Sequence, residues 1–331
     1  MTYRSKPFPS ESQPTLPIGV FDSGSGGLTV LHALRTALPE QNFIYLGDHN
    51  RAPYGPKSGP EVYEMTRQGV DFLFNQGCKL VILACNTASA IALRKLQQEW
   101  LPDRATQDTG DNRILGVLVP MVETITDRPW ARWEQHPQQN LQGTVGIFAT
   151  EATVKSNTYL VEIGKRAPML DVIQLACPEL VPALESKKDI ATMDALVEGY
   201  VRQLVEENNK IPNWIMLGCT HYPLLKNAFE KAAQKVIGKI MGESVPILCQ
   251  PSVCADSLKD YLLRHPHLIS ANNAPSVDQQ VIQNFTSGQH FTSSQHFTTG
   301  CPNHVGETAR IFQPEGFTHD VESNWVKAIL D

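Results

Sequence analysis

Short apolar segments alternate with helical patterns along most of the chain. "PIGVFD" (residues 17–22), "NFIYLGD" (42–48) and "KLVILACN" (79–86) are almost continuously apolar, and each precedes residues with helical apolar spacing, as over 61–76. Strands that are buried on both faces have this continuous pattern, whereas strands with one wet face alternate. The sequence therefore predicts α/β architecture, with mainly parallel sheets covered by helices on both sides.

A second set of strands follows the polar segment 102–113, where we place a domain junction. "RILGVLVP", "GTVGIFAT", "DVIQLAC" and "NWIMLGC" form this set, and helices fill the gaps, including one over residues 189–207. The two sets place similar segments in matching positions. We therefore expect two similar α/β domains related by pseudo-symmetry, with the active site in the cleft between them.

Composition excludes several classes of protein. The 331 residues carry a net charge of −6, which leaves no basic footprint for nucleic acid. No apolar run approaches the roughly 20 residues that span a bilayer. Residues 1–16 are polar, rich in Pro and Ser, and lack the apolar core of a signal peptide. These residues are therefore predicted to be a disordered leader. Together, the three features predict a cytoplasmic protein that contacts neither membrane nor nucleic acid.

The seven cysteines favour neither a disulfide framework nor a metal site. Their number is odd, and no C-x-x-C spacing occurs. Burial as small apolar side chains is the default for most of them. Cys301 lies in a variable tail, and Cys78 and Cys177 also suit structural roles.

A hexapeptide-like repeat occupies the C-terminal region. "FTSGQH", "FTSSQH" and "FTTGCP" follow one another from Phe285 to Pro302. The composition predicts a low-complexity surface insert at about residues 276–297. His290 and His296 are expected to be solvated there, and a last helix is expected at about residues 302–313.

Two cysteines stand out because each directly follows an apolar strand. Cys85 comes after "LVILA" and Cys219 after "WIMLG", and each is followed by small polar residues. The carboxyl ends of parallel strands are where α/β sheets build sites. A single thiol could act as a nucleophile. Two opposed thiols suit another chemistry, in which one removes a proton beside a carboxylate and the other returns a proton to the opposite face.

A nucleotide-binding site is the main alternative for the first strand. Gly24, Gly26 and Gly27 follow it, and Asp48 lies further along, as in a dinucleotide fingerprint. Thr29, however, occupies the place of the third glycine. Asp22 would also set a negative charge beside a pyrophosphate. Both features disfavour this alternative.

Four segments together resemble the glutamate racemase family: "IGVFDSGSGGLTVL", "YLGDHNRAPYGPKS", "VILACNTASA" and "IMLGCTHYPLL". "GIFATEATVKSNTY", "LACPELVPALE" and the late "FTTG" are similar as well. The resemblance extends from residue 17 to about residue 313. It implies a cofactor-independent enzyme that interconverts L- and D-glutamate with two thiols and supplies D-glutamate for peptidoglycan.

The resemblance also implies roles for individual residues. It makes Cys85 and Cys219 the proton donor and acceptor, with Asp22 assisting the first and His221 the second. Substrate-binding positions carried over from the motifs are Asp22, Ser23, Tyr54, Gly55, Asn86, Thr87, Thr220 and His221. Asp48 and Glu151 fall in motifs near the site and are further candidates. No metal ligand is implied.

The same resemblance implies that the chain crosses between the domains twice. We expect residues 17–113 and about 246–331 to form the first domain, and residues 114–245 the second. A homodimer is one option, since dimers are common in such families, but the sequence does not determine the oligomeric state. Aspartate and hydantoin racemases share paired cysteines and stay alternatives. So does a binding or regulatory module, such as the role on DNA gyrase reported for some family members.

Overall fold

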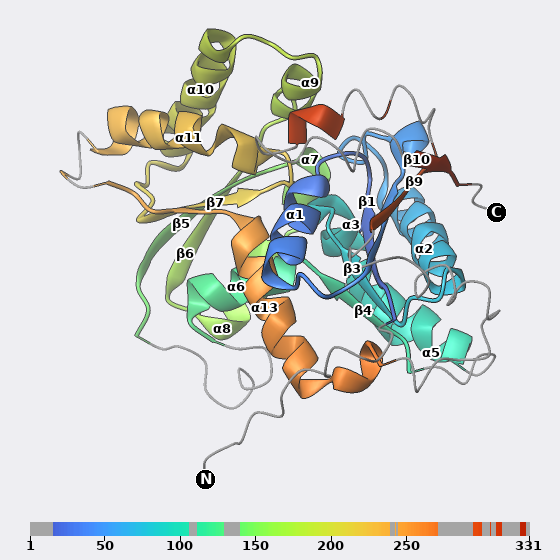
Figure 1. Cartoon of the computed structure of the whole chain (residues 1–331). Helices are drawn as coiled ribbons and strands as arrows, with labels where there is room; N and C mark the ends of the chain where they lie inside the picture. The colour runs from blue at the N-terminus through green and yellow to red at the C-terminus, as the bar shows by residue number, and fades with distance from the viewer. Residues whose placement is uncertain are drawn as a thin grey trace.

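The computed structural model describes residues 16–105, 111–128, 140–238, 242, 244–270, 294–299, 305, 309–312 and 325–328. Its strands form two parallel sheets, which lie in separate halves of the molecule (Figure 1). The first has the order β10-β9-β2-β1-β3-β4 and the second the order β6-β5-β7-β8. The predicted α/β architecture with two parallel sheets is confirmed.

The first sheet is buried on both faces, which explains its continuous apolar strands. Its strands are β1 (Ile18–Asp22), β2 (Phe43–Gly47), β3 (Leu80–Leu83), β4 (Arg113–Gly116), β9 (Ser294–Thr298) and β10 (Trp325–Lys327). Val20 and Tyr45 pack on one face with α1 (Leu28–Ala37) and α13 (Gln250–Arg264). Phe21 and Leu46 pack on the other face with α2 (Gly59–Asn75). Successive side chains of a strand point to opposite faces, so both sets of positions must be apolar.

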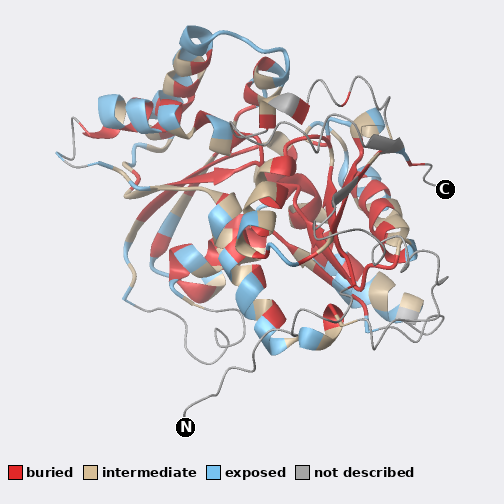
Figure 2. Ribbon diagram, viewed as in Figure 1, coloured by how far each residue is buried: buried red, intermediate tan, exposed pale blue. Residues whose placement is uncertain are grey.

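The second sheet is built in the same way. Its strands are β5 (Gly143–Ala149), β6 (Leu170–Ala176), β7 (Trp214–Gly218) and β8 (Ile247–Leu248). Phe148 and Leu217 face α10 (Ile190–Asn208) and α11 (Lys226–Ala233). Val145 and Met216 face α6 (Leu118–Thr126) and α8 (Thr158–Arg166). Figure 2 shows β5 and β7 largely buried, β6 partly exposed, and the outward faces of α10 and α11 exposed.

Short helices complete both halves. They are α3 (Asn86–Ile91), α4 (Leu93–Lys95), α5 (Leu101–Ala105), α7 (Glu151–Lys155) and α9 (Leu180–Glu185), with π-helical turns at Leu96–Trp100 and Gln234–Gly238 and 3₁₀ turns at His49–Arg51, Tyr222–Leu225, Pro266–Leu268 and Arg310–Phe312. After β8 the chain returns to the first half through α13, which packs against both α1 and α6. No helix in the described part of the chain is long and apolar enough to cross a membrane.

The strand at "RILG" belongs to the first sheet. β4 pairs with β3, with Arg113 beside Leu80 and Gly116 beside Leu83. We expected this segment to open the second set, with the boundary at residue 113. It instead extends the first sheet to Gly116, because its backbone pairs in parallel with the edge of β3. β8, just past the expected boundary at 246, pairs with β7 of the second sheet.

The C-terminal repeat contributes a strand, which contradicts the predicted surface insert over residues 276–297. β9 lies between β2 and β10 within the first sheet. His296 is fully buried rather than solvated, and Phe297 packs edge-on against Phe72 with ring centroids 5.1 Å apart. The low-complexity reading failed because Phe and Thr favour strands, whatever the repetition around them. His290, Cys301 and most of the repeat lie outside the described residues.

Two further expectations concern the ends of the chain. Residues 1–15 of the predicted leader lie outside the described residues. Leu16, the last residue of that leader, is buried, and its N–H donates to the Ile269 carbonyl (2.9 Å). In the described part of the predicted helix 302–313, Arg310–Phe312 form a 3₁₀ turn.

Candidate active site

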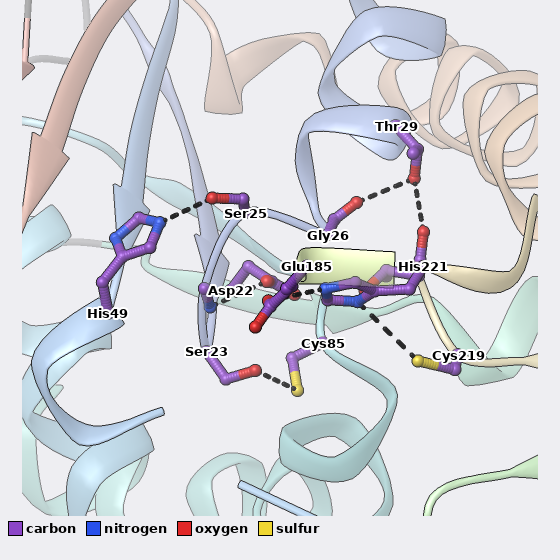
Figure 3. Close-up of polar contacts among 12 residues, drawn as sticks. Asp22, Ser23, Ser25, Gly26, Thr29, His49, Cys85, Glu185, Cys219 and His221 are labelled. Carbon is purple, nitrogen blue, oxygen red and sulfur yellow. Dashed lines mark hydrogen bonds and ion pairs between the residues drawn. The ribbon is translucent and has the colours of Figure 1, made fainter. Parts of the chain in front are cut away.

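The two singled-out cysteines lie at corresponding strand ends in the two halves. Cys85 follows β3 and begins α3, and Cys219 follows β7. Each is buried, with 5% of its surface exposed. Figure 3 shows both thiols together with Asp22 and His221, which come from opposite halves of the molecule.

Cys85 caps the short helix α3. Its sulfur accepts a hydrogen bond from the Ala88 N–H (3.4 Å) and contacts the Ser23 hydroxyl (3.4 Å). Burial and, to a smaller extent, the negative charge of Asp22 raise the pKa of the Cys85 thiol to about 12, although its bonds with Ser23 and Ala88 act to lower it. Cys85 is therefore held as a neutral thiol near neutral pH.

Asp22 closes β1 and is fully buried. Its Oδ2 accepts a hydrogen bond from the Gly24 N–H (2.9 Å). Burial raises the pKa of this carboxyl, and the charge of His221 and the backbone donors of Gly24 and Gly27 offset the rise in part. A buried carboxyl beside a thiol has the type of perturbed pKa that marks functional sites.

Cys219 has a different partner. His221 Nδ1 lies 3.9 Å from the Cys219 sulfur, and its Nε2 lies 3.1 Å from Glu185 Oε1. Burial alone would lower the pKa of His221, but the bonds to Cys219 and Glu185 and their charges raise it to about 10. The imidazole is therefore cationic at neutral pH and supplies positive charge beside the second thiol.

The two halves touch directly at this point. Thr29 Oγ1 donates to the Thr220 carbonyl (3.0 Å) and also lies 2.9 Å from the Gly26 carbonyl. A Cβ on Gly26 would lie 2.4 Å from His221 Nδ1 and 2.5 Å from Thr220 Oγ1. Residue 26 must therefore be glycine for the Cys219–His221 turn to seat against the first half.

Asn86 and Thr87 are buried in polar networks that also cross between the halves. Asn86 Nδ2 donates to Gln250 Oε1 (2.6 Å), and Asn86 Oδ1 accepts from Gln250 Nε2 (2.6 Å) and the Tyr159 hydroxyl (2.8 Å). Thr87 Oγ1 lies 2.9 Å from Thr150 Oγ1, which in turn lies 3.0 Å from Thr153 Oγ1. α13, α8 and α7 thus fix the helix that follows Cys85.

Tyr54 and Asp48 form a separate buried pair. The Tyr54 hydroxyl donates to Asp48 Oδ2 (2.5 Å), and Arg51 Nε and Thr299 Oγ1 also bond this carboxylate (each 2.7 Å). The Gly55 carbonyl accepts from the Ala152 N–H (3.1 Å). These contacts make Asp48 an anchor for the loop that carries Tyr54 and Gly55.

Glu151 is the predicted candidate that the structure leaves at the surface. It lies in the first turn of α7, is partly exposed, and pairs with Lys155 (3.4 Å). Asp22, Ser23, Cys85, Thr220, Cys219 and His221 are brought together. The roles assigned to all these residues stay predictions.

Sequence reasoning missed Glu185, Tyr159, Gln250, Thr150, Thr153 and His49. Glu185 ends the segment "LACPELVPALE", and Thr150 and Thr153 lie in "GIFATEATVKSNTY". Both segments were part of the resemblance, so a polar residue at a helix end within them was an available signal. Tyr159 ends the second of these segments, so the same signal covered it. Gln250 had no such signal, since only its long-range contacts with Asn86 and Tyr159 distinguish it.

Comparison with known proteins places the chain. No family model matches it. It is 44% identical to the glutamate racemase of Roseobacter denitrificans over 249 residues, covering 75% of this chain and 86% of that protein. The glutamate racemase of Paracoccus denitrificans is 42% identical over 256 residues, covering 77% and 88%. This chain belongs to the glutamate racemase family.

Solved structures agree with this assignment. A glutamate racemase isoform from Bacillus anthracis superposes with a TM-score of 0.71 at 26% identity, covering 95% of this chain and 98% of that chain. The Francisella tularensis glutamate racemase, solved in complex with D-glutamate, gives 0.70 at 26% identity, covering 96% and 98%. The predicted family and the predicted racemase class of enzyme are confirmed.

Proposed function

We propose that this chain interconverts L- and D-glutamate by a two-thiol mechanism in which Cys85 and Cys219 act on opposite faces of Cα. The observation that carries the proposal is the pair of buried thiols, each at a strand end in its own half and each with its own ionisable partner. Membership of the glutamate racemase family supports the substrate.

The two cysteines have different neighbours, which suits them to different steps of the reaction. His221 is cationic and its Nδ1 faces the Cys219 sulfur, so it can neutralise a thiolate there. Cys85 is held as a thiol by burial. In the L-to-D direction the Cys219 thiolate takes the α-proton, and Cys85 then donates its own proton to the opposite face of the carbanion.

The proton count follows from this step. The cycle ends with Cys219 as a thiol and Cys85 as a thiolate, which is the state needed to convert D-glutamate back to L-glutamate. Protons must be exchanged with solvent to reset the pair for another L-isomer. Asp22 and the Glu185–His221 pair are the ionisable groups beside the thiols that could carry these protons.

Deuterium labelling tests the use of two thiols. When L-glutamate is incubated in heavy water, newly formed D-glutamate should carry deuterium at Cα, whereas the remaining L-glutamate should stay protiated at early times. Chiral chromatography with mass detection follows both isomers. Equal early deuteration of the two isomers would instead indicate one base that serves both faces.

Substitution identifies the thiols. Cys85→Ala and Cys219→Ala should each abolish racemisation. Cys→Ser at either position should nearly do so, because a hydroxyl is a far weaker acid than a thiol and a far poorer base near neutral pH. Cys249→Ala, half-buried at the start of α13, is the matched control and should retain full turnover. Racemisation by Cys85→Ala or by Cys219→Ala would show that the replaced cysteine takes no part in the mechanism.

Three finer predictions accompany the reaction. The enzyme is proposed to make D-glutamate in the cytoplasm, where it supplies peptidoglycan synthesis. Complementation of a D-glutamate auxotroph by this chain tests that role. Activity should survive dialysis against a chelator without added pyridoxal phosphate. A homodimer is proposed, and light scattering coupled to size-exclusion chromatography measures the oligomeric state.

A further inference from the structure

A hydrogen-bonded chain joins the last part of the sequence to the loop that follows Asp22. His49 Nε2 lies 2.9 Å from Ser25 Oγ, and His49 Nδ1 lies 2.9 Å from both the Gly47 carbonyl and Thr298 Oγ1. Thr298 ends β9, and Ser25 lies in the turn between β1 and α1. Figure 3 shows the His49 ring directed at Ser25.

The partners of the ring determine where its proton lies. The Gly47 carbonyl can only accept, so Nδ1 must carry the hydrogen that this contact requires. Burial lowers the pKa of His49 to about 4, so the ring is neutral and Nε2 can accept a hydrogen bond. The Ser25 hydroxyl therefore donates to Nε2. The groups that face His49 electrostatically are Asp48, Glu185 and His221.

The His49 ring folds back over the end of β2, so residue 47 must leave room for it. A Cβ on Gly47 would lie 2.2 Å from His49 Cε1. Glycine at residue 47 therefore makes room for the ring, and any larger residue would displace it from Ser25. The Tyr45 hydroxyl, which donates to the Gly24 carbonyl (2.7 Å), holds the same turn from β2.

A serine beside a neutral histidine could be a nucleophile, but burial argues against that here. Ser25 has 1% of its surface exposed, so a substrate carbonyl cannot reach its oxygen. What the pair can do is fix the turn. Gly24 donates to Asp22, and Gly26 packs against His221, so this turn touches the partners of both cysteines.

We infer that His49 is a positioning residue which, through Ser25, holds the turn 23–27 so that Asp22 and His221 are both aligned with their cysteines. The inference deepens the proposed racemisation and rests on it for its kinetic consequence. Because Thr298 of β9 bonds His49, β9 also helps to hold this turn in place.

Kinetics of matched variants test the inference. His49→Phe and Ser25→Ala should each lower kcat by about tenfold to a hundredfold in both directions, because small misplacements of reacting groups have effects of this size. KM should change less than kcat. His49→Gln, whose side-chain oxygen can accept from Ser25, should recover most of the loss. His265→Phe, at the end of α13, is the control and should behave like the wild type.

A double variant tests whether His49 and Ser25 act together through their hydrogen bond or independently of each other. If Ser25 and His49 act through one hydrogen bond, His49→Phe with Ser25→Ala should lose no more kcat than either single variant. Multiplicative losses would overturn the inference. So would kcat within twofold of the wild type in both single variants, provided that circular dichroism shows them folded.

Nuclear magnetic resonance gives a readout that needs no turnover. In protein carrying ¹⁵N-labelled histidine, the His49 signals should report a neutral ring protonated at Nδ1 and still neutral at pH 5.5. His49→Phe should shift the His221 ring signals, whereas His265→Phe should not. A ring protonated at Nε2, or unmoved His221 signals, would overturn the inference. Absence of wild-type racemisation would overturn the proposed function alone, since these signals would still decide how His49 holds the turn.

Discussion

A buried imidazole ordinarily loses its charge, because desolvation penalises the cation. His221 is the opposite case, since Cys219 and Glu185 raise its pKa to about 10. Its folded-state pKa therefore exceeds the value of about 6.5 expected in the unfolded chain. The stability that this contributes is complete below about pH 6.5 and is lost as the pH rises through 10.

Glu185→Gln tests this dependence. Removing the carboxylate should lower the pKa of His221, so the alkaline limb of the kcat/KM profile should move down by about one pH unit or more. Thermal melts should lose stability at lower pH than the wild type does. Glu179→Gln, in the turn that begins the same helix, is the control. An unchanged alkaline limb would show that Glu185 does not set the charge of His221.

Asp22 shows the reverse balance, because burial raises the pKa of its carboxyl. An acid with a raised folded-state pKa costs stability near neutral pH, and this cost disappears below the ordinary carboxyl pKa of 3.8, where the unfolded chain is protonated too. Asp22→Asn should therefore raise the melting temperature at pH 7 but not at pH 3.5. Racemisation should fall by about 10²–10⁴-fold if the carboxyl assists proton transfer. A lower melting temperature at pH 7 would contradict this account.

At the scale of single elements, β9 differs most from what its sequence suggested. Phe297 packs on Phe72 and is partly buried. Phe297→Ala should therefore lower the free energy of unfolding by about 2 kcal/mol, somewhat less than for a fully buried ring. Phe291→Ala, the equivalent position one copy earlier, is the control and lies outside the described residues. Equal losses in urea melts of the two variants would contradict the assigned register.

Strands with continuous apolar runs could be predicted from sequence, and so could the cysteines that end two of them. β1, β2 and β3 lie where the pattern placed them, because burial on both faces leaves an unambiguous signal. β4 was assigned to the wrong sheet and β9 to a surface insert, since edge pairing depends on residues far away in sequence. Gln250 escaped notice for the same reason, since only its contacts with Asn86 and Tyr159, both far away in sequence, distinguish it.

At the scale of the whole molecule, Gln250 ties the halves together at the point where the chain returns to the first sheet. It is fully buried and bonds Asn86 of α3, and its Nε2 lies 3.1 Å from the Tyr159 hydroxyl of α8. Gln250→Leu would leave Asn86 without these bonds in a buried site. We expect a loss of about 2–3 kcal/mol in the free energy of unfolding. Hydrogen exchange should become faster in α3 and α8.

A matched substitution shows whether the stability lost in Gln250→Leu comes from the hydrogen bonds among Gln250, Asn86 and Tyr159. Gln203→Leu lies on the exposed face of α10, where Gln203 bonds Glu207, and should change the free energy of unfolding by less than about 0.5 kcal/mol. Tyr159→Phe combined with Gln250→Leu should cost less than the sum of the two single variants, because they share partners. Simple additivity would mean that the three side chains act independently.

The position of β9 within a repeat has a genetic consequence. The strand reads "SQHFT", and the preceding copy supplies "GQHFT", so the two differ only in their first residue. Loss of six codons by slippage during replication would delete one copy and still leave an almost identical strand followed by "TG". Loss of whole copies of six residues should therefore be tolerated by the sheet, whereas deleting one to five residues and moving the preceding ones into place would replace the fully buried His296 with a different side chain.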